Sequence, residues 1–191
     1  MMRLLARREY TCQPWRNGGG ETAEIAVRPG AGSDFLWRLS LATITRSGPF
    51  STFPGVSRIF TLVEGGPVSI RVGDAGSAEV AVGDGLKFPG DAPVRADLAG
   101  GPAMALNIMY RPEATRATIR RLSCIGPTRI QHEAATGESF LFLGGACRVE
   151  GGDVALETEA GDTLADVSGA GPLVVTPEEA CMVYAIGFGG V

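Results

Sequence analysis

The sequence predicts an all-β protein built from two similar lobes packed into one compact unit, and three observations support this prediction. Apolar residues alternate with polar or small ones along several segments. Glycine (28 residues) and proline (12 residues) are spread along the chain without a period. A set of short motifs from the first half recurs in the second. Many short alternating strands separated by frequent turns are typical of a β-sandwich or barrel.

The alternation is the primary signal, because successive side chains of a strand point to opposite faces. In the first such segment, Arg38 and Ser40 share one face, and the large apolar side chains share the other. Residues 112–122 alone are predicted to carry a helical turn or two, or simply to link the lobes. The clearest alternating segments are 35–42, 68–72 and 104–111.

An internal repeat divides the chain. Three landmarks of the first half recur after about 78 to 80 residues: an apolar strand with a glycine turn, a Gly-Asp turn and a closing apolar strand. We therefore expect one lobe over residues 1–112 and a second over residues 113–191. The repeated pairs are 60–66 with 140–145, 83–86 with 161–164, and 104–110 with 181–186.

The repeat unit resembles a cupin. The segment Leu62-Val63-Glu64-Gly65 is similar to the first cupin turn, and GDGLKFPG at 83–90 is similar to the second cupin motif. Metal-binding cupins carry two histidines and a glutamate just before the first turn. That frame places Thr52 and Pro54 at the histidine positions and Arg58 at the glutamate position. We therefore expect the first lobe to bind no metal, since an arginine would repel a cation.

In the second lobe, the same frame places His132 and Glu138 at the first-histidine and glutamate positions, with Ala134 between them. Two ligands of four do not make a metal site, so we expect no metal cofactor here either. His132 is the only histidine of the chain, which disfavours mechanisms that rely on histidine triads or relays.

Arg58 has a positive interpretation as well. An arginine at a cupin ligand position converts a cation site into an anion site, because its planar guanidinium matches a carboxylate with two parallel hydrogen bonds. We hypothesise that Arg58 holds the carboxylate of a small acid. The alternative is an arginine buried against an acidic side chain or paired outward in a salt bridge.

The most distinctive segment is PWRNGGGETAEI at residues 14–25. Its three glycines allow a close approach of the backbone to a ligand or to a neighbouring strand. Trp15 would supply an aromatic wall, and Asn17 and Thr22 would supply neutral polar contacts. Alternatively, Trp15 packs on a core and the glycines form a bulge. The segment lacks the Lys-Ser/Thr ending of a phosphate loop.

This segment resembles the signature of the HutD/Ves family. Four further motifs of that family follow in order, so the resemblance extends over about the first 110 residues; they lie at 37–42, 48–55, 88–91 and 106–109. The resemblance implies a bicupin fold, an RmlC-like cupin without an evident metal. It also implies a link to histidine utilisation, whose intermediates include urocanate and N-formylglutamate. Ala105 and Tyr110 depart from the family pattern, which often has an acidic residue and an arginine there.

We therefore expect a regulator or sensor that binds a small carboxylate, with urocanate or N-formylglutamate as candidate ligands. One alternative is a metal-independent isomerase or hydrolase acting on a small acid with Glu24 or Asp91 as base. Another is an assembly role in which exposed strand edges form a homodimer. The candidate ligand-binding residues are Arg58, Trp15, Asn17, Thr22, Glu24, Arg38, Ser40 and Asn107.

Composition limits the remaining partners. The net charge is −4 and the 17 basic residues are scattered, which disfavours nucleic acid as a partner. No apolar run has the length of a membrane helix or signal peptide, so a cytoplasmic location is expected. The cysteines lie far apart in sequence and are expected to be free, buried and inert; they are Cys12, Cys124, Cys147 and Cys181.

Overall fold

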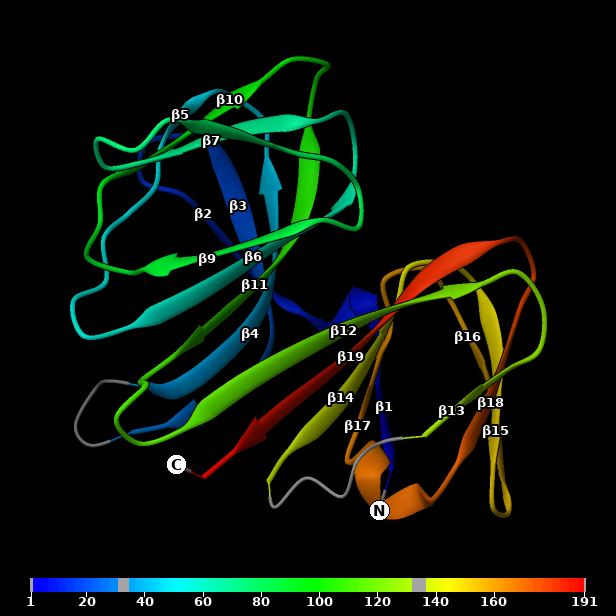
Figure 1. Ribbon diagram of the computed structural model, residues 1–191. Helices are drawn as coiled ribbons and strands as arrows, with labels where there is room; N and C mark the ends of the chain where they lie inside the picture. The colour runs from blue at the N-terminus through cyan, green and yellow to red at the C-terminus, as the bar shows by residue number, and fades with distance from the viewer. Residues whose placement is uncertain (1, 31–34, 132–136, 191) are drawn as a thin grey trace. The chain divides into compact units, whose positions relative to one another are not determined.

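The computed structural model describes residues 2–30, 35–131 and 137–190 (Figure 1). Within these ranges the chain is almost entirely β-strand, with two short 3-10 helices, η1 (Arg7–Glu9) and η2 (Val167–Ala170). The chain forms two compact units, Thr11–Thr115 and a second unit made of Met1–Tyr10 with Arg116–Val191. The prediction of an all-β chain is confirmed.

The unit Thr11–Thr115 contains two antiparallel sheets. The six-stranded sheet runs in the order β2 (Thr11–Pro14), β3 (Gly20–Pro29), β4 (Phe35–Ile44), β11 (Ala103–Tyr110), β6 (Ser57–Glu64) and β9 (Gly85–Pro89). The four-stranded sheet runs in the order β5 (Gly48–Pro49), β10 (Val94–Leu98), β7 (Val68–Val72) and β8 (Ser77–Val80).

The second unit repeats this plan with fewer strands. Its five-stranded sheet runs in the order β1 (Arg3–Leu5), β17 (Thr163–Ala165), β14 (Ser139–Leu143), β19 (Cys181–Gly189) and β12 (Arg116–Cys124). Its four-stranded sheet runs in the order β13 (Thr128–Ile130), β18 (Leu173–Pro177), β15 (Cys147–Gly151) and β16 (Val154–Thr158).

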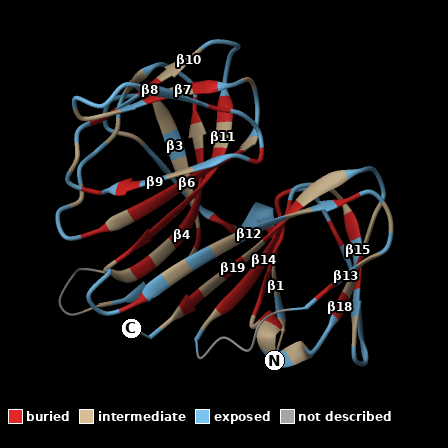
Figure 2. Cartoon of the chain, in the orientation of Figure 1, coloured by how far each residue is buried: buried red, intermediate tan, exposed pale blue. Residues whose placement is uncertain are grey.

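Each unit has its own hydrophobic core, and the buried residues concentrate on β6 and β11 in one unit and on β14 in the other (Figure 2). In the first unit, Phe60 and Leu62 of β6 pack with Ile70 of β7 across the two sheets. In the second, Leu141 and Val175 make the equivalent link between sheets. Burial of such side chains contributes roughly 1.5 to 3 kcal/mol each, which holds the two sheets of each unit together.

The internal repeat is also visible in the hydrogen bonds. The amide of Leu62 donates to the carbonyl of Asp84 (3.0 Å), and the amide of Leu143 donates to that of Asp162 (2.9 Å). The carbonyl of each leucine in turn accepts a 2.7 Å bond from the glycine that precedes each aspartate. The two Gly-Asp motifs therefore form the same turn beside the same strand in both units.

The helical expectation for residues 112–122 is largely wrong. A single turn forms where the amide of Thr115 donates to the carbonyl of Arg111 (3.0 Å). From Arg116 onward the chain is β12, which pairs with β19 along its whole length. The helix-forming residues of this stretch have only a weak intrinsic preference, and pairing with a neighbouring strand overrides it.

The observed units differ from the expected lobes of 1–112 and 113–191. The unit that corresponds to the first lobe begins at Thr11 and ends at Thr115. The first ten residues belong with the later part of the chain because β1 pairs with β17. Tyr10 anchors this segment, since its hydroxyl donates to the carbonyl of Gly161 (2.8 Å) and also lies 2.8 Å from the Thr163 hydroxyl. Burial raises the pKa of Tyr10 to about 12, so this hydroxyl stays protonated at neutral pH.

None of the four cysteines forms a disulfide, as expected, but Cys12 on β2 is exposed and Cys181 on β19 is half-buried rather than buried. None of the helices in the described ranges has the length and apolarity needed to cross a membrane.

Candidate functional site

A cavity of about 380 Å³ lies within the unit Thr11–Thr115. This volume is within the usual range for small-molecule sites. The strands β3, β4, β6 and β11 contribute side chains to its wall, and the segments around β2 and β5 contribute to its rim. Its lining residues are Thr11, Gln13, Pro14, Trp15, Arg16, Asn17, Thr22, Glu24, Arg38, Ala42, Pro49, Phe50, Ser51, Phe53, Arg58, Phe60 and Asn107.

Arg58 of β6 is a buried member of this wall, with only 7% of its surface exposed. Its Nη1 donates to the carbonyl of Ser51 (3.1 Å) and its Nη2 donates to Oδ1 of Asn107 (3.3 Å). Its Nε is buried without a hydrogen-bond partner. Three rings surround the guanidinium, with centroids 5.2 to 5.6 Å from Cζ: those of Phe50, Phe53 and Phe88.

Arg38 of β4 is the second arginine of the cavity. Its Nη2 lies 3.2 Å from the Met109 sulfur, a weak acceptor, and its Nε is also buried without a partner. Its guanidinium lies over Phe53 at 5.6 Å and over Phe35 at 5.2 Å. Phe53 therefore stands beside both arginines.

The charge of the two arginines is poorly compensated. Burial, followed by the nearby charge of Arg38, lowers the pKa of Arg58 to about 10. Burial also lowers the pKa of Arg38, while Glu24 raises it. Among the described residues, no carboxylate forms a salt bridge with either arginine. An arginine keeps its proton at neutral pH, so two positive charges face the cavity, that of Arg58 buried and that of Arg38 half-buried.

The glycine-rich segment shapes the rim. Trp15 Nε1 donates to the hydroxyl of Thr22 (2.8 Å), which fixes the indole beside β3. Asn17 makes a local turn, since its Oδ1 accepts from the amide of Gly19 (3.0 Å). A Cβ at Gly20 would lie 2.1 Å from the carbonyl oxygen of Thr43 on β4, so glycine is required there by the approach of the neighbouring strand.

The structure brings seven of the eight candidate ligand-binding residues to one cavity. Ser40 is the exception, because it is completely buried and its hydroxyl donates to the carbonyl of Asn107 (3.3 Å). Ser40 lies on the same strand face as Arg38, as expected. It is opposite Asn107 of β11 in the sheet, and its side chain is covered there and does not reach the cavity. Asp91, the second candidate base, is exposed and does not line the cavity.

Sequence analysis missed the contribution of residues 50–53. Thr52 and Pro54, placed by the cupin frame at ligand positions, are exposed, whereas Ser51 and Phe53 line the cavity. The cupin frame selected the wrong residues because this segment is a loop, in which side chains do not alternate as they do along a strand. The aromatic residues of the 48–55 motif could have indicated this contribution, since an aromatic ring next to a buried arginine can pack on the face of its guanidinium.

The second unit has no counterpart to the arginine pair in its described residues. The repeated hydrogen bonds align Leu62 with Leu143, so the position of Arg58 corresponds to Ser139 and not to Glu138, where the cupin frame had placed it. The hydroxyl of Ser139 is bonded to that of Ser168 (2.9 Å).

Metal-ligating groups are also sparse. The described ranges contain no cluster of three or more His, Cys, Asp or Glu side chains arranged to hold a metal ion. Glu138 is half-buried, while His132 and Ala134 lie outside the described residues. The expectation about a metal in this lobe stays a prediction.

Two lobes, each with a pair of antiparallel sheets and the same strand-and-turn repeat, define a bicupin. The chain belongs to the HutD family, whose model matches residues 7–182. This result confirms the family resemblance found in the sequence motifs.

Two protein relatives extend the comparison. An uncharacterized 21.2 kDa protein from the hutC 3′ region of Pseudomonas putida is 38% identical over 136 residues, which cover 71% of this chain and 70% of the relative. Protein Ves of Citrobacter koseri is 45% identical over 107 residues, which cover 56% of each chain. The match to Ves thus spans little more than half of that protein's length.

Solved structures agree with this assignment. A conserved protein of unknown function from Pseudomonas aeruginosa has a TM-score of 0.87 and 30% identity, and HutD from Pseudomonas fluorescens, in a formate condition, has a TM-score of 0.84 and 27% identity. Both comparisons cover 100% of each chain. A bacterial pirin from Escherichia coli in complex with nickel(II) has a TM-score of 0.67 at 12% identity over the whole of both chains, and this likeness concerns the fold alone.

Proposed function

We propose that this protein is a cytoplasmic binder of small carboxylates that acts as a regulator or sensor linked to histidine utilisation. One observation carries the proposal: two arginines, Arg58 buried and Arg38 half-buried, face the same cavity, and none of the described carboxylates forms a salt bridge with either. A buried charge without a partner is unfavourable. A ligand that brings a negative charge relieves that cost, which favours binding of an anion.

Both arginines have N–H donors that form no hydrogen bond with the protein. A guanidinium carries five N–H donors. Arg58 uses two of its nitrogens in hydrogen bonds to protein oxygens, and Arg38 has only the thioether sulfur of Met109 as an acceptor. Hydrogen bonds from a charged donor to a carboxylate are about twice as strong as neutral ones. The cavity therefore offers the groups that hold a carboxylate.

The walls favour a small acid with an apolar or planar part. Phe50 and Phe60 belong to the aromatic side of the cavity, and Trp15 packs edge-on against Phe50 with the ring centroids 6.0 Å apart. Asn107 and Glu24 add polar groups to the lining. Urocanate fits this combination through its carboxylate and its flat imidazole, and N-formylglutamate fits it through its two carboxylates.

The relatives support a histidine-utilisation setting. One is encoded in a hutC 3′ region, and a similar structure is that of a HutD protein described in a formate condition.

A second candidate function is a metal-independent enzyme acting on a small acid. The observation in its favour is that Glu24, whose carboxylate can accept a proton, lines the same cavity as both arginines. The acid would then be bound by the arginines and converted by an isomerisation or hydrolysis. A test of the carboxylate binder must therefore also follow the fate of the ligand.

The test is a thermal-shift and calorimetric comparison of wild type with Arg58→Met, using urocanate, N-formylglutamate, formate and histidine. A ligand at 100 times its dissociation constant stabilises the native state by about 2.7 kcal/mol, which is easily measured. We expect one of the acids to stabilise wild type but not Arg58→Met. The matched control is Arg71→Met, which removes an exposed arginine of the same unit.

Four outcomes are informative. A response to an acid that is equal in wild type and Arg58→Met would refute the arginine anchor, and a lack of response to all acids would refute the ligand class. Proton NMR of the recovered ligand separates the two functions. An unchanged ligand supports the binder, whereas a converted one supports the enzyme.

A further inference from the structure

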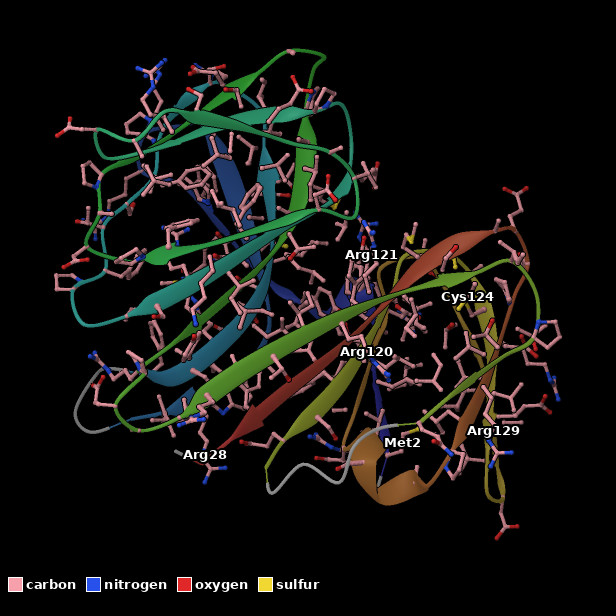
Figure 3. The ribbon with its side chains drawn as sticks, viewed as in Figure 1. Met2, Arg28, Arg120, Arg121, Cys124 and Arg129 are labelled. Atoms are coloured by element: carbon pink, nitrogen blue, oxygen red, sulfur yellow. The ribbon has the colours of Figure 1, made fainter. Side chains whose placement is uncertain are left out.

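Three of the four cysteines lie in the second unit, far from one another in sequence. Cys124 is on β12, Cys147 is on β15 and Cys181 is on β19; Cys124 is labelled in Figure 3. The sulfur atoms of Cys147 and Cys181 are 3.8 Å apart although the residues are separated by 34 positions. Cys147 is buried and Cys181 is half-buried. The fold therefore builds a pair of thiols in van der Waals contact, one of which is reachable from solvent.

The backbone around this thiol pair is fitted to hold the sulfurs together. A Cβ at Gly145 would lie 2.7 Å from the Cβ of Cys181 and 3.2 Å from its sulfur, so only glycine admits Cys181 at this place. A Cβ at Gly144 would lie 2.5 Å from the carbonyl oxygen of Met182. The sulfur of Cys147 also lies 3.3 Å from the carbonyl oxygen of Gly145, to which it donates. The turn after β14 thus brings the start of β19 against the start of β15.

We propose that Cys147 and Cys181 form a reversible oxidation site, in which a disulfide joins the two sheets of the second unit. The oxidant is a hydroperoxide. The thiolate of Cys181 attacks the peroxide and becomes a sulfenic acid, releasing the peroxide's other oxygen as an alcohol, or as water when the probe is hydrogen peroxide. The thiol of Cys147 then attacks the sulfenic sulfur and releases one water. Two thiols lose two protons and two electrons in total, and the peroxide takes them up.

Geometry selects this pair among the cysteines. The bond requires the sulfurs to approach from 3.8 Å to about 2.05 Å, a movement within the reach of side-chain rotation. Cys12 is exposed and belongs to the other unit, Thr11–Thr115, whose sequence contains no second cysteine for it to pair with. Cys124 stands opposite Cys181 in the sheet, but the sulfur in contact with that of Cys181 is the sulfur of Cys147, so Cys147 is the thiol placed to form the disulfide.

The disulfide would change the unit in a measurable way. β15 belongs to the four-stranded sheet and β19 to the five-stranded sheet, so the bond would tie together two layers that otherwise meet through apolar packing. Closing a loop of this length restricts the unfolded chain and stabilises the native state. Burial, followed by the neighbouring thiols and the carboxylate of Glu178, raises the pKa of Cys147 to about 12. Burial also raises the pKa of Cys181, so we expect slow oxidation at neutral pH rather than rapid catalysis.

The experiment treats the purified full chain with hydrogen peroxide and follows its intact mass, its free thiols and its tryptic peptides. Arg129 and Arg148 place Cys124, Cys147 and Cys181 on three separate tryptic peptides, so each pairing has its own mass. We expect a mass loss of about 2 Da, a fall in free thiols from four to about two, and a linked pair of peptides 130–148 and 149–191 that dithiothreitol separates. The oxidised protein should melt several degrees higher than the reduced one.

Variants make the assignment specific. Cys12→Ser, which removes the exposed cysteine, should leave the link unchanged, whereas Cys181→Ser should abolish it. The proposal is overturned if the linked peptides of the wild type contain Cys12 or Cys124 instead, or if Cys147 and Cys181 remain thiols after Cys12 has been oxidised. The peptide map of the wild type decides the matter even where a serine variant folds poorly.

Discussion

Replacement of Arg58 by methionine should lower the stability of the ligand-free protein by only about 1 to 2 kcal/mol while removing most of its affinity for carboxylates. A methionine keeps the apolar stem of the arginine and fills part of its volume, but it carries neither the charge nor the donors. The change distinguishes two roles for the arginine. Loss of a structural arginine mainly lowers the stability of the fold, whereas loss of a ligand-binding arginine mainly lowers the affinity for the ligand.

The size of the effect follows from the environment of Arg58. Its pKa falls from 12.5 to about 10, and at about 1.36 kcal/mol per pKa unit this corresponds to roughly 3 kcal/mol spent on holding the charge in the fold. The sign is that of a base with a depressed pKa: the charged form is disfavoured by folding at any pH below about 10, and the penalty fades as the pH rises toward 12.5. Methionine removes this penalty.

The losses are somewhat larger. Methionine forfeits the hydrogen bonds to Ser51 and Asn107, at about 1.5 kcal/mol each because the donor is charged, and the contacts of the guanidinium with the phenylalanine rings, at about 1 to 2 kcal/mol in total. The losses exceed the gain by about 1 to 2 kcal/mol, so we expect the free energy of unfolding to fall by that amount and the melting midpoint to fall by about 3 to 6 °C. Removing one partner of a well-paired buried ion pair would instead cost about 3 to 5 kcal/mol.

The assay is urea unfolding followed by far-ultraviolet circular dichroism, combined with isothermal titration of the acid that stabilises wild type. The loss of two charge-assisted hydrogen bonds, at about 1.5 kcal/mol or more each, should weaken binding by about 100-fold or more. A variant that loses 3 kcal/mol or more of stability would show that Arg58 is a structural residue. Retained affinity in a stable variant would show that the ligand is held elsewhere.

Three further changes test the neighbourhood of the cavity. Arg38→Met should weaken acid binding by at least about 10-fold, because it removes the second charged donor; calorimetry measures this, and unchanged affinity would leave Arg58 as the sole anchor. Glu24→Gln should tighten binding of a simple acid, since it removes the negative charge that acts on Arg38, whereas an enzyme with Glu24 as base would lose turnover, visible by NMR. Gly20→Ala should destabilise the protein by about 2 to 3 kcal/mol because its Cβ would overlap the carbonyl of Thr43. Gly48→Ala, at a position with no atom within 4 Å of the added Cβ, is the control in urea unfolding, and equal effects of the two alanines would refute the close-approach argument.

The sequence predicted the two-lobed β architecture well because alternation and a repeat are properties of the chain itself. Arg38 and Asn107 could be assigned to the same neighbourhood since each lies on an alternating strand, and the structure places these strands, β4 and β11, side by side. Period-2 patterning could not show that Ser40 is sealed beneath this face, because burial within a sheet depends on the neighbours of the strand and not on its own pattern.

The parts that were missed depend on long-range contacts or on loops. β1 joins the later part of the chain through pairing with β17, and nothing in a three-residue segment reveals its partner. Phe53 stands in a loop, where no periodicity indicates the direction of a side chain, yet it lies 5.6 Å from both arginines of the cavity. The contact of Cys147 with Cys181 likewise depends on the packing of two sheets, which the spacing of cysteines in the sequence does not encode.

The most direct test of the carboxylate-binding account is a crystal structure of the protein with urocanate bound at saturating concentration. The account predicts density for the acid in the cavity of the unit Thr11–Thr115, with its carboxylate oxygens within about 3 Å of guanidinium nitrogens of Arg58 or Arg38. Density for the acid at another place, or in the cavity with its carboxylate turned away from both arginines, would contradict it.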